Sequence, residues 1–157
     1  MSRGCLRGHE AKYIAELIAM KYNIKDKLPQ STNDTYVERI HEEQEQRDTF
    51  CTALSKPIND LIRIEREKLK NPLPSIRDVL EKGANVKKDL QKVDNAATDL
   101  QLVKTSITLA RDEIENLLLS YGINGNTGII VEKCHEEAKS MAKKMKASNE
   151  TNQCYLK

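Results

Sequence analysis

Residues 86–121 read VKKDLQKVDNAATDLQLVKTSITLARDEIENLLLSY and decide the fold of this chain. Apolar residues recur in this stretch at alternating steps of three and four, in two successive registers. The first register is Val86, Leu90, Val93, Ala97 and Leu100, and the second is Val103, Ile107, Ala110, Ile114, Leu117 and Tyr121. Such spacing keeps one narrow apolar stripe, here called the seam, on one side of a helix that packs along another helix. Two three-residue steps in a row join the registers, which predicts local overwinding or a change of partner.

A second long helix is predicted to start at a capping box formed by Thr35 and Glu38, whose side chains can accept hydrogen bonds from unpaired backbone amides. Its seam combines apolar and polar positions: Val37, Ile40, Gln44, Arg47, Cys51, Leu54, Ile58 and Leu61. The polar positions predict that the first half is solvated or faces a polar partner. Pro57 falls inside this repeat, and because the spacing continues across it we favour one kinked helix over a new helix capped by Ser55.

Proline and glycine mark where the helices end. Pro72 and Pro74 predict a corner at residues 71–75, since a helix cannot continue through them, and the two long helices are expected to fold back as a hairpin. Gly122 followed by Ile123 predicts a Schellman cap at the end of the long helix of residues 86–121.

Shorter helices are predicted at both ends of the chain. The first covers about residues 9–22, and its expected apolar side is Tyr13, Leu17, Met20 and Ile24, beside Ile14 and Ile18. The last is rich in lysine and has a thin apolar face formed by Ile130, Cys134, Ala138, Met141 and Met145. From Ser148 onward the sequence is polar, and we expect a disordered tail.

These elements predict an all-α protein, an elongated helical hairpin or coiled-coil-like bundle of two long helices with shorter flanking helices. Residues 1–30 would form the N-terminal short helix, residues 31–125 the hairpin, and residues 126–157 the basic helix and its tail. The composition agrees, because 38% of the 157 residues are hydrophobic but only 4% are aromatic. A shortage of aromatic side chains is typical of an elongated helical body rather than a compact globule.

The N-terminal sequence and the cysteine spacing favour an intracellular protein, cytoplasmic or nuclear, with removal of a preceding signal as the alternative. The net charge is only +2, no apolar run has the length of a signal peptide, and no stretch approaches the roughly 20 apolar residues of a membrane span. The four cysteines lie far apart without repeated spacing, so we expect free thiols: Cys5, Cys51, Cys134 and Cys154.

None of the three histidines lies in a complete catalytic or metal-binding motif. Neither Cys5 with His9 nor Cys134 with His135 extends to a set of four metal ligands, and Glu38 with His41 is a single Glu-x-x-His pair where a di-metal bundle needs two. We therefore expect no enzyme activity, no metal and no cofactor.

The sequence thus predicts a non-catalytic subunit, an adaptor or scaffold that binds other helical chains as a homo- or hetero-oligomer. The expected partner-binding residues are the large seam positions: Val86, Leu90, Val93, Leu100, Val103, Ile107, Ile114, Leu117, Tyr121, Leu54, Ile58 and Leu61. One alternative is an accessory nucleic-acid-binding protein, since residues 1–30 carry 6 basic and 3 acidic residues and residues 126–157 carry 6 and 4. Another is a secreted four-helix signalling bundle with two disulfides.

Overall fold

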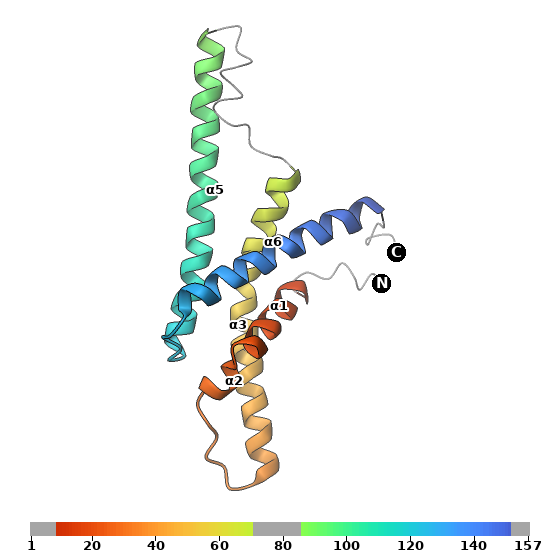
Figure 1. Ribbon diagram of the computed structural model, residues 1–157, viewed down its shortest axis with the longest axis vertical. Coiled ribbons are helices and arrows are strands. Elements are labelled where there is room, and N and C mark those ends of the chain that lie inside the picture. The colour runs from red at the N-terminus through yellow and green to blue at the C-terminus, as the bar shows by residue number, and fades with distance from the viewer. Residues whose placement is uncertain (1–8, 71–85, 152–157) are drawn as a thin grey trace.

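The chain folds into helices arranged around one long central helix (Figure 1). The structure, a computed structural model, describes residues 9–70 and 86–151, without the side chains of residues 86–97 and 147–151. In these ranges the elements are α1 (His9–Lys21), α2 (Ile24–Lys27), α3 (Tyr36–Lys70), α5 (Val86–Ser120) and α6 (Thr127–Thr151). The all-α prediction is confirmed. The corner predicted at residues 71–75 lies outside the described residues.

Helices α3 and α5 form the antiparallel pair that the sequence predicted. Phe50 in the first half of α3 packs edge-on against Tyr121 just after α5, with ring centroids 5.1 Å apart and ring planes at 86°. Toward the other end, Ile64 of α3 and Val103 of α5 line the same groove. The first half of α3 therefore lies beside the C-terminal end of α5, and the two helices are antiparallel. The pair is long and gives the molecule its elongated outline (Figure 1).

The core surrounds the middle of α3, which contacts α1, α5 and α6. Its seam residues from Cys51 onward are fully enclosed, namely Cys51, Leu54, Ile58 and Leu61, and so is Phe50 beside them. Helix α5 adds Ala110, Ile114 and Leu118, and α6 adds Ile130, Val131, Cys134, Ala138 and Ala142. The predicted apolar face of α6 therefore lies inside, with Met141 and Met145 half-buried at its edge. Gln44 and Arg47 are exposed, in agreement with a solvated start of α3.

The inward face of α1 differs from the predicted one. Tyr13, Leu17 and Met20 are exposed, and the predicted grouping was wrong on these three residues. The buried stripe consists instead of small and β-branched residues: Ala11, Ile14, Ala15, Ile18 and Ala19. Both stripes have helical spacing, but three alanines let the backbone of α1 come close to its neighbours, and large side chains there would hold it away. Helix α1 ends at Lys21, and Asn23, which has a left-handed φ of 52°, precedes Ile24 at the start of α2.

Helix α3 runs without a break through Pro57, so the single-helix interpretation is confirmed over a restart at Ser55. Pro57 is itself fully buried. A proline inside a helix removes one backbone hydrogen bond and costs about 3 kcal/mol, which the packing on both sides of Pro57 must offset. At the start of α3, the Thr35 carbonyl accepts the first helical hydrogen bond, from the Arg39 amide at 2.9 Å.

The Schellman cap at the end of α5 is confirmed. Gly122 has a φ of 80°, the Ile123 amide donates to the Leu118 carbonyl at 2.9 Å, and the Gly122 amide donates to the Leu119 carbonyl at 2.9 Å. Leu118 and Ile123 are both buried, which gives the apolar contact that accompanies this motif. Helix α6 then starts at Thr127 and extends to Thr151, beyond the predicted start of the tail at Ser148.

Candidate functional site

An open groove lies between the last turns of α3 and the middle of α5. It encloses about 460 Å³ and is lined by Arg63, Ile64, Glu67 and Lys68 of α3 and by Leu102, Val103 and Ser106 of α5. Leu102 is 62% exposed, and Leu109, two helical turns further along α5, is 64% exposed. Large apolar side chains with this much exposure are the type of surface that partner helices cover.

The predicted partner-binding residues divide into three groups. Leu54, Ile58, Leu61 and Ile114 are fully buried in the chain's own core. Five positions on or just after α5 are half-buried: Leu100, Val103, Ile107, Leu117 and Tyr121. The side chains of Val86, Leu90 and Val93 lie outside the described residues, although the backbone at these positions is helical. Partner contact along the seam stays a prediction.

The N-terminal half of α5 extends beyond the C-terminal end of α3 (Figure 1). Helix α3 ends at Lys70, and its residues Arg63 to Lys68 lie level with Leu102 to Ser106 of α5. The α5 positions before about Leu100 are therefore past the end of the helix that covers the rest of its seam. We call residues 86–100 the α5 extension.

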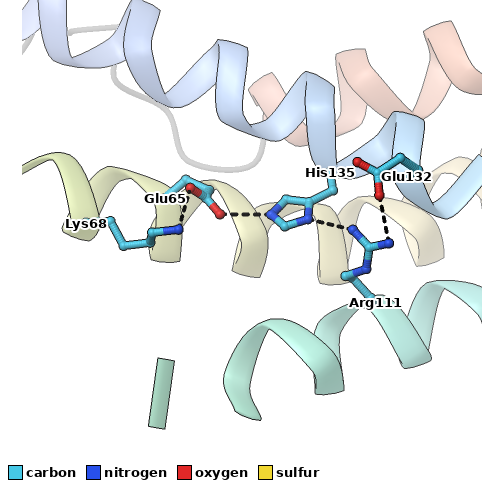
Figure 2. Close-up of polar contacts among 5 residues, drawn as sticks. All are labelled: Glu65, Lys68, Arg111, Glu132 and His135. Atoms are coloured by element: carbon cyan, nitrogen blue, oxygen red, sulfur yellow. Dashed lines mark hydrogen bonds and ion pairs between the residues drawn. The ribbon is translucent and has the colours of Figure 1, made fainter. Parts of the chain in front are cut away.

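A polar network with a buried centre, His135 and Glu65, joins α3, α5 and α6 (Figure 2). His135 of α6 and Glu65 of α3 are each only 6% exposed, and His135 Nε2 lies 2.8 Å from Glu65 Oε2. Arg111 of α5 contacts His135 Nδ1 at 2.7 Å through Nη1 and donates to Glu132 Oε1 at 2.9 Å through Nη2. Lys68 Nζ lies 3.3 Å from the other oxygen of Glu65. Hydrogen bonds through His135 thus connect α6 to both α3 and α5.

The contacts fix the tautomer of His135. A guanidinium group can only donate, so His135 Nδ1 accepts from Arg111, the ring proton is on Nε2, and Nε2–H donates to Glu65. Burial alone would raise the pKa of Glu65, but the hydrogen bonds from His135 and Lys68 and the charge of Lys68 lower it below 4.5. A hydrogen bond from Arg111 likewise lowers the pKa of Glu132.

This network is suited to holding helices together rather than to chemistry. Both ring nitrogens of His135 are engaged by protein groups, so neither is available as a general base or a metal ligand. Within the described ranges, no three His, Cys, Asp or Glu side chains gather closely enough to hold a metal ion. We therefore regard the network as structural support for the surface formed by α3 and α5.

Sequence reasoning did not foresee this network, although it left a signal. The α3 seam continues from Leu61 by one four-residue step to Glu65, which puts a carboxylate at a core position. A carboxylate at such a position needs a buried partner. Its buried partner His135 is 70 residues away in the sequence on another helix, and Arg111, which contacts the other ring nitrogen of His135, lies on a third helix, so nothing local pointed to either.

Cys51 and Cys134 are free thiols inside the core. Burial raises the pKa of Cys51 to about 11 and that of Cys134 to about 12, so almost no thiolate is present near pH 8. In a Cys5→Ser/Cys154→Ser variant we expect both thiols to react with a thiol reagent at least about 100-fold more slowly in the folded than in the denatured chain. Fast reaction in the folded chain would show that α3 and α6 separate readily. Absence of free thiols in the denatured, unreduced wild-type chain would favour the secreted alternative.

Comparison with protein-family models, curated proteins and solved structures gave no match to this chain. Among the helices in the described ranges, none combines the length and the apolar character needed to cross a membrane.

Proposed function

We propose that this chain is a non-catalytic, intracellular helical subunit that binds partner helices along α5. Its role would be that of an adaptor or scaffold, with a coiled-coil-type contact between the chains. The observation that carries the proposal is the α5 extension, a stretch of helix with a continuous apolar seam that passes the end of α3 (Figure 1).

Among the described helices, α3 ends before it reaches this part of the seam. Within the described side chains, α3 and α6 pack against the second register of α5, where Ala110 and Ile114 are buried, together with Leu118 beside it. The first register, from Val86 to Leu100, has the same spacing but lies beyond Lys70. A narrow apolar seam gains little from burial against the turns of its own helix, so its side chains favour contact with another helix.

The groove between α3 and α5, whose side chains the structure describes, supports the same proposal. Its apolar residues Ile64, Leu102 and Val103 continue the extension toward the core, and Leu102 and Leu109 are mostly exposed beside it. A helix laid along the extension would also reach this groove. The polar network of Glu65, His135 and Arg111 would keep α3 and α5 at a fixed separation, so that the binding surface is already formed before a partner arrives.

Leu90→Asp should abolish partner binding and leave the fold intact, because it puts a charge on the seam far from the core. The matched control is Gln91→Asp, which adds the same charge one position off the seam. We would capture proteins from a cell lysate on the tagged full chain and quantify them by mass spectrometry, with helicity measured in parallel. We expect the recovered partners to fall about tenfold or more for Leu90→Asp and to stay unchanged for Gln91→Asp. Equal recovery by both variants would contradict the proposal.

A further inference from the structure

The second half of α6 is strongly basic, although its first half is mixed in charge. Residues 138–146 include four lysines and no acidic residue. Two of the three glutamates in the first half are engaged within the protein, because Glu132 accepts a hydrogen bond from Arg111 at 2.9 Å and Glu137 pairs with Lys133 at 3.3 Å. These two carboxylates are therefore occupied and do not neutralise the lysines that follow.

The fold places the basic end of α3 beside this half of α6. The two helices meet through Glu65 and His135, and α6 continues past α3 (Figure 1). Lys146 Nζ donates to the Leu69 carbonyl at 3.4 Å, so the ends of the two helices are in contact. We call the surface that they form the basic patch. Its members are all exposed except the half-buried Arg66, and they are Arg66, Lys70, Lys139, Lys143, Lys144 and Lys146.

Much of the positive charge of the protein is concentrated at this patch. Residues 65–70 and 138–146 together carry seven basic and two acidic residues, a net charge of +5, whereas the whole chain has a net charge of +2. The rest of the chain is therefore net negative. One of the two acidic residues, Glu65, is buried and already bonded to His135 and Lys68. A local concentration of like charge attracts polyanions even where the net charge of the protein is small.

The surroundings of the patch favour a nucleic-acid duplex over a membrane or a single strand. A helix binds a membrane surface by burying its apolar face in the lipid, but the apolar face of α6 lies in the core, where Ala138 and Ala142 are buried. Proteins that bind single strands stack bases on aromatic side chains, and residues 65–70 and 138–146 contain none. Lysines without aromatic residues suit the phosphates of a duplex, which they contact as point charges.

The shape of the patch favours DNA over RNA. An α-helix with its side chains is about 10 to 12 Å across, and the major groove of B-form DNA, about 12 Å wide, admits it. The major groove of double-stranded RNA is too deep and narrow for side chains to read. A helix that presents lysines along its exposed side therefore reaches phosphates on a DNA duplex more readily than on an RNA duplex.

We propose that the basic patch binds the phosphate backbone of double-stranded DNA, with the exposed side of α6 along the major groove. This inference does not rest on the proposed function, which uses α5. Contacts between lysine and phosphate carry no sequence information, so we expect binding without sequence preference. The expected dissociation constant is on the order of 10 µM at about 100 mM salt, as is typical of binding through phosphate contacts alone.

Fluorescence anisotropy of a labelled DNA duplex of about 20 base pairs, titrated with the full chain, tests the proposal. Four to six phosphate contacts predict that log K falls against log salt with a slope of about −4 to −5 between about 50 and 200 mM. Lys143→Gln/Lys144→Gln should weaken binding about tenfold and make the slope less steep by about 2. Both lysines are exposed, and circular dichroism should show unchanged helicity.

Two further double variants show whether the patch extends over both helices. Arg66→Gln/Lys70→Gln removes two charges from the end of α3 and should weaken binding in the same way. The matched control, Lys25→Gln/Lys56→Gln, removes two exposed charges outside the patch and should leave the salt slope unchanged.

Three outcomes would overturn the proposal. The first is an absence of duplex binding at about 200 µM chain and about 50 mM salt. The second is an equal loss of binding in the control and in the α6 variant, which would assign binding to overall charge rather than to the patch. The third is binding to an RNA duplex of the same length, or to vesicles of anionic phospholipid, that is as tight as binding to DNA.

Discussion

Replacing Glu65 with alanine should lower the free energy of unfolding by about 3 kcal/mol. The substitution leaves the His135 Nε2–H without its acceptor, at a site where Glu65 and His135 are each 6% exposed. It also removes the carboxylate that pairs with Lys68. A buried donor without an acceptor costs more than the hydrogen bond contributed, because water cannot replace the lost partner. Urea unfolding at pH 7, followed by circular dichroism, measures the change.

Two further variants identify the cause of this loss. Glu65→Gln keeps an oxygen that can accept from His135 but loses the charge, and we expect it to cost about 1 kcal/mol. Glu113→Ala removes an exposed carboxylate from α5 and should change stability by less than about 0.5 kcal/mol. Should Glu65→Ala cost no more than Glu113→Ala, the network would contribute nothing to holding the three helices.

The stabilisation from Glu65 should also depend on pH in a defined direction. Its pKa in the folded chain is lowered from 4.5, so the folded state favours the ionised carboxylate. The contribution is therefore fully present above about pH 4.5 and is lost as the pH falls through the folded pKa. The difference in stability between wild type and Glu65→Ala should be constant from about pH 7 to 5 and should narrow in more acidic solution.

Features set by neighbouring residues could be predicted from the sequence. The two long helices follow from the three- and four-residue steps, and the Schellman cap at Gly122 follows from glycine's access to a positive φ. The continuity of α3 through Pro57 was predicted because the seam spacing continues on both sides. Each of these signals is contained within a few turns of helix.

Features set by distant contacts could not be predicted. Two faces of α1 have helical spacing, and the choice of Ala11 and Ala15 over Tyr13 and Leu17 depends on how closely other helices approach. The network of Glu65, Arg111 and His135 joins residues on three helices, and single-sequence patterns carry no information about such pairing. The candidate surface falls between these cases, since its seam was predicted but its position beyond the end of α3 required the structure.

Leu118→Ala should lower the free energy of unfolding by about 3 to 4 kcal/mol, whereas Leu117→Ala should cost only about 1 to 2 kcal/mol. The seam spacing permits either residue after Ile114, and Leu117 was the predicted one. In the structure Leu118 is fully buried and Leu117 is half-buried, because the chain must bring Ile123 back against Leu118 to complete the cap of α5.

The two substitutions remove the same atoms from adjacent positions on α5, so their difference reports the burial of each side chain rather than helix propensity. Urea unfolding of both variants under one set of conditions gives this difference directly. A larger loss for Leu117→Ala would mean that α5 is rotated about its axis relative to the structure. Such a rotation would move Arg111 away from His135 and would turn Leu102 and Leu109 toward α3, so the groove proposed to receive a partner helix would no longer be open.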